Sequence, residues 1–408
     1  MTFTTLEQLP LSEVRARADR LRAHVRELYP NASGLLVFSR LSIYYLSGSW
    51  ANGMLWAPLD GDPVLLCRKG LERSRLDSPL AQILEYKSYS QVPGLLKEAG
   101  APLGDEVAVE MSGLPWSMGE LLRSKLPGVS FVSGDMAINW TRAVKTEWEL
   151  NKLRLAGARH DRALNDTLPD LIRPGMTERE ISLAVWDAFY RHGHQGMMRM
   201  QNAGEEIFLG HVAAGDSGNY PSVFNGPLGL RGAHPVLPFL GYAGKVWKKD
   251  EPLAIDCGFC LEGYHTDKTQ IYWQDESRVP EAAEVAQDFC QQIQDYLAGH
   301  LKPGAIPAHL YRECIKIALQ NDLGEGFMGL GRNKVGFLGH GIGLAIDEWP
   351  VIAPSFERPL EENMVLALEP KIGIPGLGMV GVENTFLVTP AGGQSLTGER
   401  FGPTFISC

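Results

Sequence analysis

The sequence of 408 residues predicts an α/β amino-terminal domain, residues 1–140, and an α+β second domain, residues 141–408, that contains an internal repeat. Strand-like and helical patterns alternate through the first part, which is typical of an α/β domain. Two similar helix pairs follow, and acidic residues of the second part stand inside apolar, strand-like segments. The chain is long enough for two domains with separate hydrophobic cores.

The amino-terminal domain should begin with an amphipathic helix at about residues 13–28, where apolar residues recur with a helical period. Runs of apolar and β-branched residues after this helix predict short strands. The runs are Gly34–Phe38, Ile43–Leu46, Pro63–Cys67, Val107–Val109 and Val129–Val132.

The second domain contains a duplicated unit of two helices joined by a basic residue, a proline and a glycine. The first pair covers about residues 146–172 and 177–193, and the second covers about residues 280–301 and 306–322. Their joints are Arg173-Pro174-Gly175 and Lys302-Pro303-Gly304. Proline ends a helix and glycine supplies the turn, so one such joint carries little information. The second joint, 129 residues further on, indicates an internal repeat.

The segment from Pro252 to Trp273 predicts a β-hairpin with an acidic residue on each arm. Apolar and β-branched residues flank a Gly-rich centre. Asp256 and Asp267, eleven residues apart, occupy the two arms. Aspartate is depleted in strands and is costly to bury unless it is paired or binds a metal ion. Two such residues around one turn therefore indicate a polar site.

Three further polar residues stand in similar surroundings: His340 between glycines, and Glu369 and Glu383 after apolar strand-like runs. A buried acid of this kind needs an ion pair or a cation. Four carboxylates and one imidazole, with no sulfur ligand, suit two divalent ions, and Mn²⁺, Co²⁺ and Zn²⁺ are the best candidates. Two adjacent ions deprotonate a shared water at neutral pH, so the pattern predicts a dinuclear metallohydrolase.

The composition is that of a globular enzyme and argues against several other classes. A net charge of −10 argues against nucleic acid as a partner. The six cysteines form no disulfide framework, and Cys257 and Cys260 are expected to be buried thiols. The sequence shows no signal-peptide pattern and no apolar run long enough to span a membrane, so we expect a cytoplasmic protein.

The acidic motifs resemble those of the pita-bread metallopeptidase family, which includes methionine aminopeptidase, aminopeptidase P, prolidase (Xaa-Pro dipeptidase) and creatinase. The resemblance covers almost the whole chain and implies a pita-bread catalytic domain with pseudo-twofold symmetry, a creatinase-type amino-terminal domain and a homodimer. The matching segments are Ile255–Gly258, Gly263–Asp267, Gly339–Leu344, Leu368–Pro370 and Val382–Thr385.

The resemblance also implies a role for each residue of the set. Asp256 would bind one metal ion, and His340 and Glu369 the other. Asp267 and Glu383 would bridge the two ions. Glu369 would relay the proton of the attacking hydroxide.

The chain departs from the family pattern at three positions. Asp347, seven residues after His340, replaces a second histidine usual in these peptidases, and Gly381 replaces an arginine common in prolidase-like enzymes. A third histidine usually precedes the first aspartate, and here Phe239 stands at that spacing. The Gly- and Pro-rich stretch 215–249, a predicted loop over the site, offers His234 or Asn225 instead. The catalytic candidates are therefore Glu369, His234 and Asp347.

These observations predict a metal-dependent, Xaa-Pro peptidase-like hydrolase that cleaves a peptide or amide bond in a small substrate. Two alternatives stay open. One is a hydrolase of a non-peptide C–N bond, similar to creatinase or ectoine hydrolase. The other is a metal-bound but catalytically silent binding protein.

Overall fold

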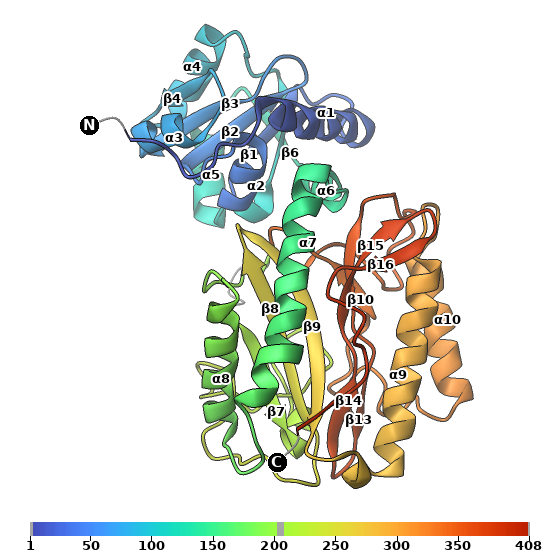
Figure 1. The fold of residues 1–408 in the computed structure, drawn as a ribbon. Coiled ribbons are helices and arrows are strands. Elements are labelled where there is room, and N and C mark those ends of the chain that lie inside the picture. Colours follow the sequence, from blue (N-terminus) through green and yellow to red (C-terminus); the bar gives the residue numbers. More distant parts are fainter. Residues whose placement is uncertain (1–2, 202–207, 407–408) are drawn as a thin grey trace. The chain divides into compact units, whose positions relative to one another are not determined.

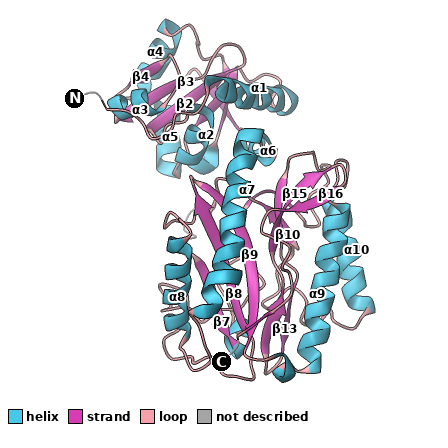
Figure 2. Ribbon diagram, in the orientation of Figure 1, coloured by secondary structure: helices cyan, strands magenta, loops and turns pink. Residues whose placement is uncertain are grey.

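The computed structural model describes residues 3–201 and 208–406. The chain forms two compact units, residues 1–142 and 143–408. The first unit is built on one mixed sheet in the order β4-β3-β2-β1-β5-β6 (Figures 1 and 2). Its strands are β1 (Gly34–Val37), β2 (Asn52–Pro58), β3 (Val64–Lys69), β4 (Ile83–Glu85), β5 (Glu106–Val109) and β6 (Ser130–Ser133). Its helices are α1 (Leu11–Leu28), α2 (Arg40–Ser47), α3 (Leu71–Asp77), α4 (Val92–Glu98), α5 (Trp116–Lys125) and α6 (Asp135–Ala143).

The prediction of a strand at Ile43–Leu46 is wrong, because these residues lie within helix α2. The Ser39 side chain accepts a hydrogen bond from the Ser42 backbone N–H and caps the start of the helix. Gly48, with φ of 73°, ends it in the left-handed conformation. Caps at both ends therefore override the β-propensity of an aromatic and β-branched run. The other predicted strands of this domain are present as β1, β3, β5 and β6.

The second unit holds two larger sheets and a short hairpin. One sheet has the order β17-β9-β8-β7, and the other has the order β11-β10-β12-β15-β16. The first contains β7 (Gly210–Ala214), β8 (Leu253–Leu261), β9 (Tyr264–Trp273) and β17 (Thr404–Phe405). The second contains β10 (Gly339–Gly341), β11 (Glu348–Val351), β12 (Val365–Leu368), β15 (Asn384–Thr389) and β16 (Gly392–Ser395). The hairpin pairs β13 (Lys371–Ile374) with β14 (Gly378–Gly381).

Two helix pairs cover these sheets, as the internal repeat predicts. Helices α7 (Glu147–Arg162) and α8 (Glu178–Arg191) pack against β7, β8 and β9, whereas α9 (Glu281–His300) packs against β13, β14 and β16 (Figure 1). Helix α10 (Pro307–Gln320) packs beside α9. This arrangement of mixed sheets and paired helices confirms the predicted fold class.

The two Pro-Gly joints have the same backbone conformation and the same hydrogen-bond pattern. Gly175 and Gly304 have φ of 97° and 93°. Gly175 N–H donates to Trp247 O, and Trp247 N–H donates back to Met176 O. In the second copy Gly304 N–H donates to Leu360 O, and Leu360 N–H donates back to Ala305 O. The repeat therefore extends from the sequence motif to its tertiary contacts.

The two sheets are joined by side-chain hydrogen bonds between β9 and the start of β15. Thr269 donates its hydroxyl to Glu383 Oε2 at 2.9 Å and its backbone N–H to Glu383 O at 3.2 Å. Thr385 Oγ1 accepts from Asp267 N at 2.9 Å and donates to Asp267 O at 2.9 Å. The two threonines thus hold the acidic residues of opposite sheets beside each other.

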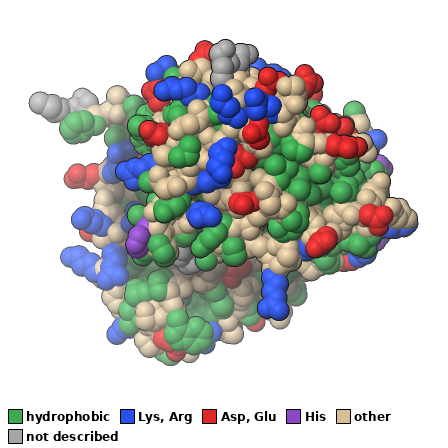
Figure 3. Space-filling view, turned by 90° about the horizontal axis from the view of Figure 1, so that it is seen from below, with side chains coloured by type: hydrophobic (Ala, Val, Ile, Leu, Met, Phe, Trp, Pro, Cys, Tyr) green, Lys and Arg blue, Asp and Glu red, His purple; other side chains and the backbone are tan. Residues whose placement is uncertain are grey.

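One face of the molecule carries charged side chains of both signs together with apolar side chains (Figure 3). On the face shown in Figure 3, Lys and Arg side chains lie among Asp and Glu, with hydrophobic groups between them. Within the described ranges, no helix is both long enough and apolar enough to cross a bilayer.

A buried glutamate ties the long loop before β8 to helix α8. Glu178 is fully buried at the first position of α8. Its two carboxylate oxygens accept hydrogen bonds from Ala214 N and from Tyr242 N, both at 2.8 Å. Its backbone N–H donates to Lys245 O. Both ends of the segment between β7 and β8 are therefore fixed to one helix end.

Replacing Glu178 by alanine should lower the free energy of unfolding by about 2–4 kcal/mol, because two buried backbone N–H groups lose their acceptor. Chemical denaturation of the purified protein measures this change. Glu180→Ala is the matched control, since Glu180 lies on the same helix but is exposed, and its carboxylate accepts its hydrogen bonds from the Thr177 cap. An equal loss of stability in the two variants would contradict the anchoring role of Glu178.

Candidate metal centre

The two aspartates lie on the same face of the β8–β9 hairpin. Asp256 pairs with Thr269, and Asp267 pairs with Gly258. Directly opposed residues share a face, as do residues two apart on one strand, so both carboxylates point to one side. Gly258, opposite Asp267, lines a cavity, and the Met198 side chain packs where a Cβ of residue 258 would lie. The predicted hairpin with one acid on each arm is present.

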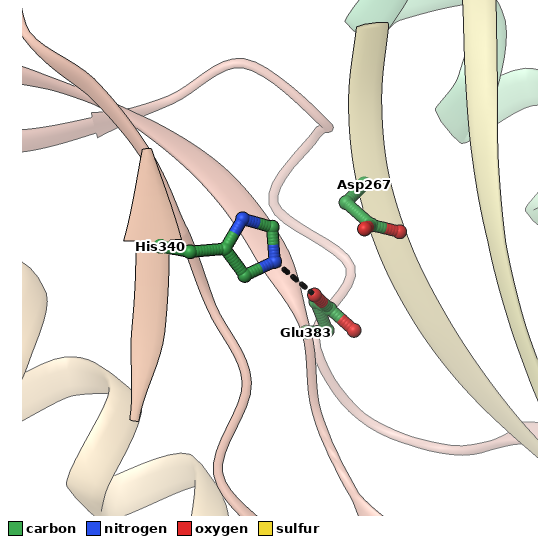
Figure 4. Close-up of side chains that lie close together, drawn as sticks. All are labelled: Asp267, His340 and Glu383. Atoms are coloured by element: carbon green, nitrogen blue, oxygen red, sulfur yellow. Dashed lines mark ion pairs between the residues drawn. The ribbon is translucent and has the colours of Figure 1, made fainter. Parts of the chain in front are cut away.

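The other three predicted residues come from the second sheet. His340 lies on β10, Glu369 follows β12 directly, and Glu383 immediately precedes β15. Ligand atoms of Asp267, His340 and Glu383 all lie within 4.8 Å of one another (Figure 4). Each of these side chains offers a donor atom that hard or borderline divalent ions accept, so the group fits a metal ion.

The tautomer of His340 is set by its own backbone surroundings. Its Nδ1 lies 3.0 Å from Gly341 O, and a carbonyl can only accept, so Nδ1 carries the proton. The Nε2 lone pair then faces the glutamates, at 3.6 Å from Glu369 Oε1 and 3.9 Å from Glu383 Oε1. A backbone partner that orients a metal-binding imidazole in this way is usual at metal sites.

A lysine that was not predicted from the sequence lies among the same acids. The Lys371 Nζ atom is 2.7 Å from Glu383 Oε2, 3.1 Å from Glu369 Oε2 and 3.3 Å from Asp256 Oδ2. Its side chain is only 1% exposed. The one sequence signal was a lysine two residues after Glu369, at the start of an apolar strand.

The ionisation of the cluster follows from its burial and its crowding. Burial and the negative charge of Asp256 raise the pKa of Asp267 to about 7. Burial and the charge of Asp267 raise the pKa of Glu383 well above its usual range. Burial alone would lower the pKa of Lys371, but its acidic neighbours hold it well above the usual value. Buried like charges cannot all ionise without cations, so the cluster favours cation binding.

The acids open onto a cavity of about 230 Å³. Asp347 lines it and accepts a hydrogen bond from Gln201 N at 2.7 Å. Asn225, from the predicted loop over the site, also lines it. His234 is exposed, accepts a hydrogen bond from Val236 N, and is not among the residues that line this cavity. A catalytic role for His234 therefore stays a prediction.

His211 is a second cavity residue that the sequence pattern did not single out. It lies on β7 directly opposite Asp256 and packs against the Phe224 ring with centroids 4.8 Å apart. It is 7% exposed, and its Nε2 has no hydrogen-bond partner among the described residues. Burial lowers the pKa of this imidazole to about 4, so it is neutral at pH 7. In the sequence, His211 was marked only by its place beside a glycine in a short strand.

The backbone conformation at position 381 explains why this residue is a glycine. Its φ of 144° is rarely adopted by residues with side chains, and a Cβ there would lie 2.4 Å from Pro370 O. Both backbone groups of Gly381 bond to the Gln287 side-chain amide. No arginine side chain can project from this backbone, so the cavity lacks that cation.

Comparisons with known proteins agree with this geometry. The family model of metallopeptidase family M24 matches residues 151–390, and that of the creatinase/prolidase N-terminal domain matches residues 17–144. An Xaa-Pro dipeptidase from Pyrococcus furiosus is 26% identical over 93% of this chain and 97% of its own. An Xaa-Pro dipeptidase from Lactobacillus delbrueckii subsp. lactis is 30% identical over 71% of this chain and 70% of its own.

The structure of dipeptidase PepE from Mycobacterium ulcerans superposes with a TM-score of 0.78 at 23% identity, and the match covers 98% of this chain and 100% of that one. This likeness shows that the fold is shared. The family-model match spans more than half of the chain and includes all five predicted ligands. The chain therefore belongs to metallopeptidase family M24 and carries a creatinase/prolidase-type N-terminal domain.

Proposed function

We propose that this protein hydrolyses a peptide or amide bond in a small substrate and that the chemistry lies within the second domain, residues 141–408. The convergence of Asp267, His340 and Glu383, which all line one cavity, carries this proposal. A cavity of about 230 Å³ is below the usual range of about 300–1,000 Å³ for drug-sized ligands, which favours a substrate of dipeptide size. The names of the relatives make Xaa-Pro dipeptides the first class to test.

We propose two divalent ions, Mn²⁺, Co²⁺ or Zn²⁺, held by the five predicted ligands. Asp256 would serve one ion, His340 and Glu369 the other, and Asp267 and Glu383 both. The oxygen-rich donor set supports these metals over copper(I) or an iron–sulfur cluster. When bound, the ions supply a hydroxide at neutral pH and polarise the scissile carbonyl.

The chain's own residues would bind the substrate and move protons. The Glu369 carboxylate is the proposed proton relay, because its Oε1 faces the His340 side of the cluster while its Oε2 is held by Lys371. The neutral His211 imidazole, whose Nε2 has no described partner, can hydrogen-bond a substrate group at the Asp256 end. Phe224 and Trp349 supply apolar walls.

Two features favour substrates that lack an exposed carboxylate. Asp347 places a negative charge on the cavity wall, and the backbone at Gly381 excludes the arginine common in prolidase-like enzymes. A free dipeptide carboxylate would meet repulsion rather than a fixed cation. Neutral or cationic amides, including non-peptide C–N substrates, are therefore the second class to test.

We also propose that the protein is a cytoplasmic homodimer. Five cysteines, including Cys257 and Cys260, are buried and free, which suits a reducing compartment. The dimer rests on the family resemblance. Size-exclusion chromatography with light scattering tests it.

Metal removal should abolish hydrolysis. Substitution of the acidic ligands should lower kcat far more than substitution of His234. Glu369→Gln should lower kcat by about 100-fold or more, the scale expected for loss of general acid–base catalysis. His234→Ala is the comparison variant, because His234 lies outside the cavity lining. The assay is turnover of Xaa-Pro dipeptides, longer peptides and small amides after chelation and after metal return. Near-normal turnover of Glu369→Gln would mean that the chemistry lies elsewhere.

Asp347 should limit the cleavage of Xaa-Pro dipeptides. For Xaa-Pro dipeptides the unmodified enzyme should show a kcat/KM below about 10⁴ M⁻¹s⁻¹, which is the lower end of the usual range for enzymes. Asp347→His should raise this value, because an imidazole can hydrogen-bond a carboxylate that an ionised aspartate repels. Asp347→Asn removes the charge without adding an imidazole and separates the two effects. Efficient cleavage by the unmodified enzyme would contradict this account.

A further inference from the structure

Each metal-binding glutamate divides its two oxygens between two different partners. The Oε1 atoms of Glu369 and Glu383 face His340 Nε2, at 3.6 Å and 3.9 Å. Their Oε2 atoms face Lys371 Nζ, at 3.1 Å and 2.7 Å. Glu383, the proposed bridging glutamate, would present one oxygen to each of two ions. Here the second oxygen is already paired with an ammonium.

The third partner of Lys371 is the acid assigned to the other ion. Asp256 Oδ2 lies 3.3 Å from Lys371 Nζ. The ammonium therefore contacts one oxygen from each of three predicted ligands. Two of these oxygens, Asp256 Oδ2 and Glu383 Oε2, belong to ligands proposed for the ion at the Asp256 end. Asp267, His340 and Glu383 form the group whose ligand atoms lie within 4.8 Å of one another (Figure 4).

The lysine is held in this place by its strand. Lys371 pairs with Gly381 in the β13–β14 hairpin, and its carbonyl accepts the Met328 N–H at 2.8 Å. Gly381 is fixed in turn by the Gln287 amide. The side chain is 1% exposed, so the ammonium is buried among its carboxylate partners.

We propose that the Lys371 ammonium occupies the place of one of the two divalent ions, so that the ions bind in order and with very different affinities. The first ion binds on the His340 side, at His340 and Glu369 together with Asp267 and Glu383. The second binds at the Asp256 end only when it displaces the ammonium from its three carboxylates. This inference rests on the proposed metal-dependent function but concerns the order of ion binding, which can be measured without substrate.

The physical reason is competition for the same buried oxygens. An ammonium with three carboxylate partners already offsets much of their repulsion, so an incoming ion gains less from them. Displacing the ammonium also leaves a buried positive charge without its partners, which is costly. The ion at the His340 side meets neither penalty, because it uses the oxygens that the lysine leaves free.

Calorimetric titration of the metal-stripped full-length protein with Mn²⁺ tests the proposal. The unmodified protein should show two binding phases whose Kd values differ by about 100-fold or more. Lys371→Met removes the charge while keeping a long side chain. It should tighten the second phase to within about 10-fold of the first and leave the first little changed. Equal affinities in the unmodified protein, or an unchanged second phase in Lys371→Met, would overturn the proposal.

Lys145→Met is the matched control. Lys145 is also a buried lysine, and it pairs with Glu348 at 3.1 Å, an acid outside the metal-binding set. Both Mn²⁺ phases should therefore be unchanged in this variant. If Lys371→Met does not fold, Lys371→Gln and the titration of the unmodified protein still decide the question. A protein that binds Mn²⁺ as expected but cleaves no peptide or amide would contradict the hydrolase proposal alone.

Discussion

Repulsion among four carboxyl groups, those of Asp256, Asp267, Glu369 and Glu383, is the constraint on which the second unit depends. Three of these residues are buried, and the side chain of Asp256 is only 16% exposed. Buried negative charges this close need cations or protons. The structure supplies a fixed cation in Lys371 and a group that fits a divalent ion beside His340. The strands, threonine contacts and glycines around the cluster hold these groups in position.

The internal repeat explains how acids from distant parts of the sequence come together. Each copy contributes a helix pair and a sheet, and the seam between the copies runs between β9 and β15. Thr269 and Thr385 cross this seam and bond to Glu383 and to the Asp267 backbone. A site at such a seam takes ligands from both halves.

Most of the candidate site could be proposed from the sequence, because acidic residues in apolar strands are conspicuous. It did not predict Lys371, since a single lysine near a strand start is usually exposed, and only the tertiary fold turns this one inward. His211 was hidden for a similar reason, because its pairing with Asp256 depends on strand register. The run at Ile43–Leu46 was assigned wrongly because its helix is set by the caps at Ser39 and Gly48. Local patterns thus located the charges, but not the long-range pairs that decide how the charges are neutralised.

Lys371 and Gly381 face each other across one hairpin, where the family resemblance leads one to expect an arginine at the second position. The cation at this hairpin therefore points into the carboxylate cluster rather than toward a substrate carboxylate.

Anomalous scattering at the manganese edge, from crystals equilibrated with one equivalent of Mn²⁺, tests this account most directly. The account predicts a single peak bounded by Asp267, His340 and Glu383, with Lys371 Nζ still against Glu383 Oε2. A peak at the Asp256 end, or two equal peaks with the lysine displaced, would contradict it.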